Sequence, residues 1–251
     1  PSNDELWSML SITEDLTANA GESSNFAWTF NAQNGSFDSL AQGETLTLTY
    51  TITATDSADD ELSATQTITI TITGTNDVPT VDVDVSEGDS VQSELIEGDV
   101  GLTTEGIFTV NDLDLSDTVT FALTDVRIDG TYGNEIPVNL SVDLLAMLSV
   151  SSDPIDANVE DEHNVNWTFD SLGEAFDYLG EDETLELTYT VTGTDSFGAT
   201  VTQDITITIT GTNDIPVLSA DVVNLTETDS AADRSEEHTS ELQSLAYLVC
   251  R

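Results

Sequence analysis

An internal repeat constrains this sequence more than any other feature. The segment GETLTLTYTITATDS (43–57) matches DETLELTYTVTGTDS (182–196), and QTITITITGTNDVP (66–79) matches QDITITITGTNDIP (203–216). Because a repeat sets the size of the structural unit, a fold proposed for one copy has to hold for the other.

The spacing of the matches divides the chain into repeats. We expect residues 1–79 to be the C-terminal part of a first repeat and residues 80–216 to be a complete repeat. Residues 217–233 then start a third repeat. The sequence therefore predicts a tandem array of one kind of module.

The repeated segments alternate between apolar residues and threonine. Leu46 and Leu48 fall on one side and the intervening threonines on the other, and residues 68–72 repeat the pattern. A period of two is typical of a β-strand with one buried face. Further strands are expected at 81–85, 107–110, 118–123, 125–129 and 164–169, and only 143–149 has helical character. We predict an all-β chain of tandem Ig-like β-sandwich repeats, with Trp28 and Trp167 in the cores.

The two ends of the sequence carry little information about function. It begins at Pro1 without a secretory signal pattern, so targeting segments are expected to lie outside it. Residues 234–251 (RSEEHTSELQSLAYLVCR) resemble translated sequencing-adapter sequence, and we expect no domain there. Cys250 is the sole cysteine and lies in that segment, so the sequence does not indicate a redox compartment.

The charge balance excludes several classes of partner. The chain has 49 acidic residues against 3 basic ones, a net charge of −46. Setting 234–251 aside leaves 46 acidic residues and Arg127 as the one base. Nucleic acid and anionic membrane surfaces bind basic side chains, so neither is an expected partner of this chain. No apolar run is long enough to span a membrane. Cations are the partners that such a chain favours.

Acidic residues gather where the expected strands end. The groups are the linker pairs Asn76, Asp77 and Asn213, Asp214; the loop residues Asp112, Asp114 and Asp117; Asp56 and Asp195 at strand ends; and Asp38, Glu44, Asp177 and Glu183 before those strands. If the strands near 185 and 205 form a hairpin, Asp195 lies close to the entry linker 76–79. Asp38 and Glu44 lie on the other side of that linker, so carboxylates of two repeats should meet at one junction.

Such a junction has the chemistry of a calcium site. Ca²⁺ takes about six to eight oxygen ligands in flexible geometry, whereas Mg²⁺ keeps more of its water. No cluster of cysteine and histidine indicates zinc or copper. The alternative is that the acidic loops only keep the surface solvated.

The motifs resemble those of a known family. An acidic pair before the penultimate strand, A-x-D at 54–56 and N-D at 76–77 resemble cadherin repeats. W-x-F at 28–30, F-D-x-L at 37–40 and the closing I-T-I-T-G-T-N-D-x-P are more closely similar to VCBS repeats, the cadherin-like modules of large RTX-type bacterial surface adhesins. Gly193 and the residues Val78 and Ile215 depart from the cadherin pattern.

The resemblance implies a calcium-rigidified extender exported by type I secretion to the bacterial cell surface for adhesion and biofilm formation. Its partners would be calcium ions, neighbouring repeats and, through other modules, a host or biofilm surface. Glu87 would be the early-strand glutamate that joins Asp177, Glu183, Asn213 and Asp214 at the second junction.

Catalysis finds little support in the sequence. His163 is the one histidine outside 234–251, there is no lysine, and nucleophile-elbow, zinc-protease and phosphate-loop motifs are absent. We expect no enzyme. Two alternatives stay open: a carbohydrate- or cell-binding module, for which Tyr132 and Tyr178 are the candidate loop aromatics, and a spacer within a secreted enzyme or toxin.

Overall fold

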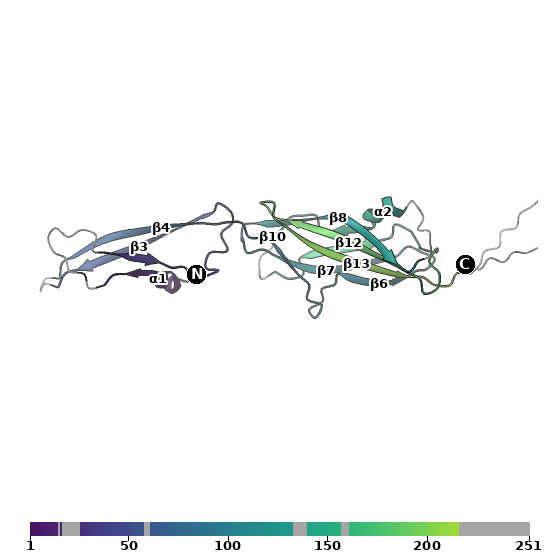
Figure 1. The fold of residues 1–251 in the computed structure, drawn as a ribbon, viewed down its shortest axis with the longest axis horizontal. Helices are drawn as coiled ribbons and strands as arrows, with labels where there is room; N and C mark the ends of the chain where they lie inside the picture. The colour runs from purple at the N-terminus through teal and green to yellow at the C-terminus, as the bar shows by residue number, and fades with distance from the viewer. Residues whose placement is uncertain (15, 17–25, 58–60, 133–139, 157–160, 216–251) are drawn as a thin grey trace, which may run out of the picture.

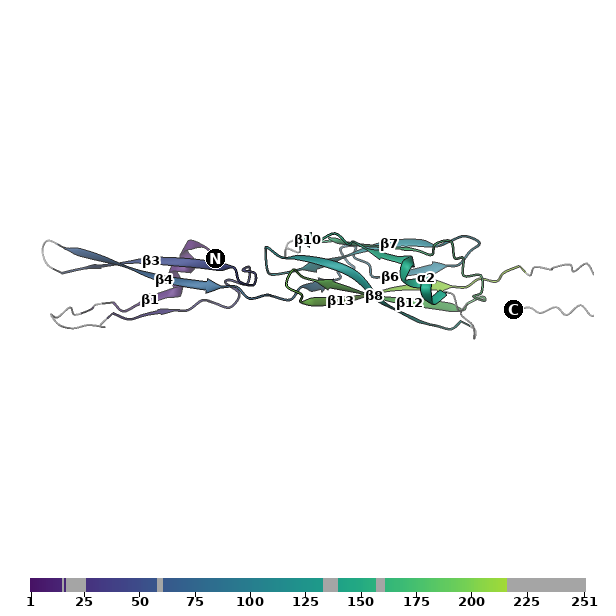
Figure 2. The same ribbon diagram turned by 90° about the horizontal axis from the view of Figure 1, so that it is seen from above.

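The chain forms two β-rich units that follow one another along an elongated molecule (Figures 1 and 2). The computed structural model describes residues 1–14, 16, 26–57, 61–132, 140–156 and 161–215. The expected third repeat (217–233) and the adapter-like segment (234–251) lie outside the described residues. We call residues 1–79 the first unit and residues 80–215 the second unit.

The first unit is built on one long hairpin. Strands β3 (Thr45–Thr55) and β4 (Ser63–Thr73) pair antiparallel along their whole length, with Thr45 opposite Thr73. A second antiparallel pair and a short helix pack beside the hairpin: α1 (Asn3–Met9), β1 (Leu10–Ile12) and β2 (Trp28–Phe30). Tyr50 on β3 fastens them, because its hydroxyl donates a 2.7 Å hydrogen bond to the carbonyl of Leu6.

The second unit is a sandwich of two sheets. The five-stranded sheet has the order β10 (Ile155–Asp156), β8 (Thr118–Gly130), β12 (Thr184–Thr194), β13 (Thr200–Thr210), β6 (Gln92–Ile96). The four-stranded sheet has the order β5 (Thr80–Asp82), β7 (Thr103–Asn111), β11 (Val165–Asp170), β9 (Leu148–Val150). Helix α2 (Leu140–Met147) leads directly into β9. The pairing is antiparallel except between β13 and β6, which run parallel.

The alternating sequence accounts for the core of this sandwich. Leu185, Leu187, Tyr189 and Val191 on β12 are fully buried. The core continues through both sheets in a single cluster that includes Trp167. Each large apolar side chain buried in this way contributes roughly 1.5–3 kcal/mol. The prediction of an all-β sandwich is therefore confirmed.

The two equivalent tryptophans have different surroundings. Trp167 is 1% exposed, its Nε1–H donates to the carbonyl of Ser90 at 2.7 Å, and a Cβ added at Gly106 would lie 2.4 Å from its ring. Trp28 is 45% exposed, so the expectation that it packs in a core is wrong for the described residues. The reason is the strand beside each tryptophan. Trp167 lies on β11, which pairs with β7, whereas Trp28 lies on β2, which within the described part of the first unit pairs with β1 alone.

Several element boundaries differ from the sequence expectation. The two strands expected at 118–123 and 125–129 are one strand, β8, in which Thr124 is the extra residue of a bulge opposite Thr190 and Val191. The strand expected at 81–85 ends at Asp82, and the helix expected at 143–149 covers 140–147 before the chain becomes extended. The short strands β1, β6, β9 and β10 were not expected, because two to five residues give too little periodicity.

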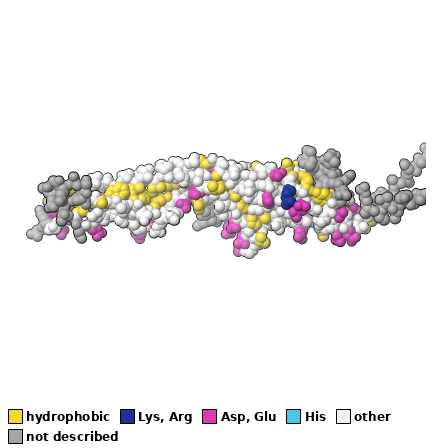
Figure 3. Space-filling model, viewed as in Figure 1, with side chains coloured by type: hydrophobic (Ala, Val, Ile, Leu, Met, Phe, Trp, Pro, Cys, Tyr) yellow, Lys and Arg dark blue, Asp and Glu magenta, His cyan; other side chains and the backbone are white. Residues whose placement is uncertain are grey.

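On the face drawn in Figure 3, acidic side chains lie on both units. Figure 3 shows a band of apolar side chains on the first unit. Arg127 is the one lysine or arginine among the described residues, and it pairs with Asp129 at 2.9 Å on the outside of the sheet. Neither described helix is long and apolar enough to cross a membrane.

Candidate metal centre between the two units

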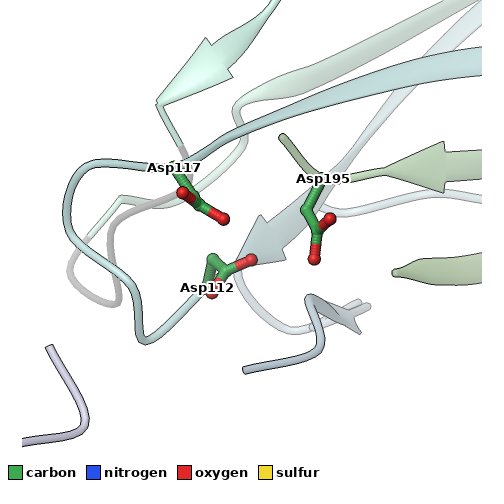
Figure 4. A group of neighbouring side chains, drawn as sticks. All are labelled: Asp112, Asp117 and Asp195. Carbon is green, nitrogen blue, oxygen red and sulfur yellow. The ribbon is translucent and has the colours of Figure 1, made fainter. Parts of the chain in front are cut away.

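Three buried carboxylates converge at the end of the second unit that faces the first. Asp112 and Asp117 lie in the loop between β7 and β8, and Asp195 lies at the end of β12. Each has an oxygen within 4.8 Å of an oxygen of the other two, and their exposures are 2%, 4% and 6%. Figure 4 shows the three side chains pointing toward a common space. Carboxylates that share a buried space repel one another unless a cation or protons balance them.

The local backbone holds these carboxylates in place. Asp112 accepts a hydrogen bond from the backbone N–H of Asp114 at 3.0 Å, and the Asp117 N–H donates to the carbonyl of Asp114 at 3.1 Å. The alternating D-x-D-x-x-D spacing therefore makes a tight turn with its side chains inward. Asp195 closes its own turn by accepting from the N–H groups of Phe197 and Ala199 at 2.9 and 2.8 Å.

The linker between the units lies directly on this cluster. The Asn76 side-chain amide donates to Asp195 Oδ2 at 2.8 Å, and the Asp77 backbone N–H donates to Asp114 Oδ2 at 2.8 Å. The structure thus brings together the linker residues, the loop residues and the strand-end residue that the sequence placed at one junction.

The junction contains buried oxygens without hydrogen-bond partners. They are Asn76 Oδ1, Asn111 Oδ1, Asp112 Oδ2, Asp114 Oδ1 and Asp117 Oδ2. Nearly all buried polar atoms in proteins have a partner, so a group of unpartnered oxygens is a place for ordered water or a bound cation. A donor set of carboxylate and amide oxygens fits a hard cation of the calcium type. Asn111 was not among the residues expected from sequence, because one asparagine at a strand end carries no distinctive pattern.

The proton affinities of the carboxylates reflect their crowding. Burial, followed by the charges of Asp114 and Asp112, raises the pKa of Asp117 to about 6. Burial also raises the pKa of Asp112, and the pKa of Asp77 is raised by burial and then by Asp114. These directions show that the junction disfavours its own negative charge.

Residues of the first unit add negative charge to the same junction. The charge of Asp38 contributes to the raised pKa of Asp77, and that of Glu44 to the raised pKa of Asp117. Both side chains are exposed. Glu44 Oε2 also accepts from the N–H of Ala41 at 3.1 Å, so part of its role is to close its own turn. Asp38 and Glu44 therefore lie at the rim of the cluster, while the linker residue Asn76 and the second unit supply the buried oxygens.

A glycine at the end of β4 sets the distance between this turn and the linker. A Cβ at Gly74 would lie 2.1 Å from the carbonyl oxygen of Leu40, and the Gly74 N–H donates to the Glu44 carbonyl at 2.8 Å. Gly211 repeats the arrangement, with Gly180 O at 2.3 Å from its Cβ position and a 2.8 Å bond to Glu183. The repeated G-T-N-D motif thus begins with a residue that has no room for a side chain.

The exit end of the second unit has a related but sparser group. Glu97, which follows β6, is 5% exposed, and its Oε1 accepts from the Thr212 N–H at 2.6 Å while Oε2 has no partner. Burial raises its pKa, with Asp214 and Asp177 contributing through their charges. Asn213 and Asp214 are exposed, and Glu183 Oε2 closes its turn on Gly180 N at 2.9 Å.

The structure places Glu97, and not Glu87, beside the exit linker. Glu87 lies in the turn after β5, where its charge acts on His163. Glu97 reaches the linker because β6 runs parallel to β13 and ends beside it, with Ile96 opposite Thr210. Sequence analysis missed Glu97 because the five-residue strand before it was not predicted.

The loop aromatics considered as a binding platform are packed against the core. Tyr132 and Tyr178 are partly buried against the main cluster, and the Tyr178 hydroxyl is among the buried atoms without a partner. Burial raises the pKa of Tyr178 above its usual range. Neither ring is presented to solvent as a flat binding surface.

Comparisons with known proteins give structural similarity only. No protein-family model matches the chain, and no curated protein matches it. Solved structures that are similar include protocadherin gamma B2 extracellular cadherin domains 1–5, with 16% identity, a TM-score of 0.41, and coverage of 83% of this chain and 34% of that one. The protocadherin gamma B4 extracellular domain has 13% identity, a TM-score of 0.39 and coverage of 81% and 27%. The protocadherin gamma B7 EC3-6 cis-dimer has 16% identity, a TM-score of 0.38 and coverage of 81% and 41%. This chain therefore spans less than half of each of those chains, and we base the function proposed below on the carboxylate geometry.

Proposed function

We propose that the chain is a non-catalytic structural repeat region whose junctions are stiffened by Ca²⁺. One observation carries the proposal: buried oxygens of the linker residue Asn76 and of the loop residues Asp112, Asp114 and Asp117 lack partners at the point where two units meet. A cation there would have ligands from the linker and from the second unit at once. Its binding would therefore restrict the angle between the units.

The proposed ligand set follows from position and burial. At the first junction it consists of Asn76, Asp77, Asp112, Asp114, Asp117 and Asp195, with Asp38 and Glu44 at the rim. At the exit it consists of Glu97, Asp177, Glu183, Asn213 and Asp214. Calcium would supply positive charge that offsets the repulsion between the carboxylates of the junction.

The sequence motifs support a biological setting for these repeats. Residues 1–79, 80–216 and 217–233 would be successive VCBS-like repeats of an extracellular bacterial adhesin exported by type I secretion. Tandem repeats stiffened in this way would hold an adhesive module away from the cell. Adhesion and biofilm formation are the processes that such an extender would serve.

Thermal unfolding with calcium and with chelator tests the metal proposal. A ligand that binds only the folded state adds RT ln(1 + [L]/Kd) to stability, about 2.7 kcal/mol at 100 times Kd. We expect a higher Tm in calcium, and small-angle scattering should show a stiffer elongated particle. An equal Tm and equal scattering profiles in both conditions would contradict the proposal.

A matched pair of variants ties the effect to the site. Asp112→Asn keeps the shape of a buried ligand but removes its charge, whereas Glu105→Gln makes the same change at an exposed position on β7. The calcium-dependent rise in Tm should shrink in Asp112→Asn and persist in Glu105→Gln. Equal loss in both variants would mean that the effect is general screening of charge.

A further inference from the structure

A buried carboxylate outside the junction is paired with a histidine. Asp89 is 3% exposed and lies at the end of the turn that follows β5. Its Oδ2 accepts from the backbone N–H of Asp84 at 3.0 Å, and its Oδ1 lies 2.6 Å from His163 Nδ1. Both oxygens are thereby satisfied, one by the turn itself and the other by a residue 74 positions away.

The histidine is held by its backbone as well as by its ring. His163 has φ +56°, in the left-handed region that is uncommon for residues other than glycine. Its N–H donates to Thr109 Oγ1 at 2.9 Å. The next residue, Asn164, uses its side chain to bond both the N–H and the carbonyl of Val110, each at 2.9 Å.

These bonds attach the loop at 161–164 to the end of strand β7. The regular pairing of β11 with β7 ends at Val165 opposite Phe108. The backbone N–H of His163 and the side chain of Asn164 continue the contact to Thr109 and Val110. The pair with Asp89 then joins this loop to the turn at 84–89.

Every charged group that acts on His163 is negative. Asp89, Asp84 and Glu87 face it from the turn, and Glu162 precedes it in its own loop. Strand β7 contributes the uncharged Thr109. The pKa of His163 is raised, first by the hydrogen bond to Asp89. Burial opposes this rise, and the charges of Asp89, Glu162 and Glu87 add to it.

We propose that His163 and Asp89 form a pH-dependent clasp that fastens the turn at 84–89 to the loop at 161–164. When His163 is protonated, its Nδ1–H donates to the Asp89 carboxylate as a charged pair, and the clasp is strongest. When the imidazole is neutral, the same bond is made between a neutral donor and a buried anion. Charge-assisted hydrogen bonds are stronger than those with a neutral partner.

The direction of the pH effect follows from the raised pKa. The clasp adds its full stabilisation below the ordinary pKa of histidine, 6.5, and loses the charged contribution as pH rises through the higher folded value. This titration is separate from that of the junction carboxylates, which do not contact His163. Saturating calcium throughout the experiment would keep those carboxylates ionised if they bind it.

Nuclear magnetic resonance of the whole chain tests the proposal. The imidazole of His163 is distinguished from that of His238 by the variant His238→Gln. We expect the pKa of His163 to lie above 6.5, and Asp89→Asn to lower it toward that value. The backbone amide signals of the turn at 84–89 should shift with the same midpoint in the unmodified chain and lose that transition in His163→Gln.

Three results would overturn the clasp. They are a His163 pKa at or below its ordinary value, an unchanged pKa in Asp89→Asn, and turn amides that keep their transition in His163→Gln. If Asp89→Asn does not fold, the His163→Gln experiment decides alone. Glu105→Gln, which alters an exposed charge on β7, should leave both the pKa and the amide transition in place.

Discussion

The Asn76 side-chain amide donates a 2.8 Å hydrogen bond to the Asp195 carboxylate, 119 residues farther along the chain. One partner belongs to the linker that closes the first unit, and the other to the end of β12 in the second. This bond leaves Asn76 Oδ1 buried without a partner beside the carboxylates of the β7–β8 loop. The orientation of the linker and the donor set of the junction are therefore determined together.

Asp117→Asn should have opposite effects with and without calcium. The pKa of about 6 means that ionising Asp117 in the folded apo chain costs on the order of 3 kcal/mol at neutral pH, at the rate of about 1.36 kcal/mol per pKa unit. Removing the charge should raise Tm in chelator. In calcium the variant should be less stabilised, because a tenfold loss of affinity costs about 1.4 kcal/mol. A lower Tm in chelator would contradict this account.

The apo chain should gain stability on mild acidification. The folded pKa values of Asp117, Asp112 and Asp77 are raised, so the folded state takes up protons at a higher pH than the unfolded state. The destabilising charge of Asp117 is present at neutral pH and is relieved as pH falls through about 6 toward the ordinary value of 3.8, and protonation of Asp112 and Asp77 acts in the same direction. Tm measured in a chelator that remains effective over this range should rise as pH falls from 7 to about 5. Calcium affinity should weaken over the same interval, because the ligands must be deprotonated.

The same acidification profile in Asp112→Asn/Asp117→Asn provides the control. This double variant lacks the two most crowded carboxylates, so its gain should be much smaller. A full gain in the variant would assign the effect to His163 or to the general negative charge of the chain.

Gly74→Ala should destabilise the first unit and shift the linker. The added Cβ would meet backbone oxygen of Leu40 at 2.1 Å, and backbone cannot swing aside as a side chain does. We expect a loss of about 1–3 kcal/mol in denaturant unfolding, together with weaker calcium binding. Gly98→Ala is the matched control, because a Cβ there meets nothing within 4 Å and φ is not in the left-handed region. Equal effects of both substitutions would contradict the close-approach argument.

The two tryptophans of the W-x-F motif should differ sharply on truncation. Trp167→Ala removes a fully buried ring and a hydrogen bond, and should cost about 3–5 kcal/mol. Trp28→Ala removes a ring that is 45% exposed and should cost much less. Denaturant unfolding followed by tyrosine fluorescence measures both. Similar losses would show that Trp28 has more buried contacts in solution than its exposure indicates.

Sequence reasoning was most successful where long segments alternate strictly. The paired segments at 43–57 and 182–196 contain β3 and β12, and their apolar residues face inward as the period of two requires. The short strands could not be predicted from the sequence, because they pair with strands that are far away along the chain. Glu97 was missed for that reason, since its place beside Thr212 depends on β6 lying next to β13.

The motifs predict some features of the structure and leave others undetermined. In the antiparallel hairpin of β12 and β13, Asp195 lies at the turn, which is the end where the chain enters the second unit. The structure places Asn76 against it. The motif does not determine which of its two tryptophans is buried, because burial depends on the strands that pack around each one. Trp28 and Trp167 share the W-x-F pattern, but Trp167 is covered by β7 and bonded to Ser90, whereas Trp28 is 45% exposed.

The parallel contact between β6 and β13 has a mechanical consequence. Gln92 to Ile96 lie opposite Thr206 to Thr210, and the chain enters the unit before β6 and leaves it after β13. Tension applied between the two ends of the unit acts first on β5, which pairs with β7, and then pulls the start of β6 backward and the end of β13 forward. The five residue pairs are then loaded in shear, all at once, instead of being peeled apart in sequence. A unit connected in this way resists stretching between the point where the chain enters it and the point where the chain leaves it.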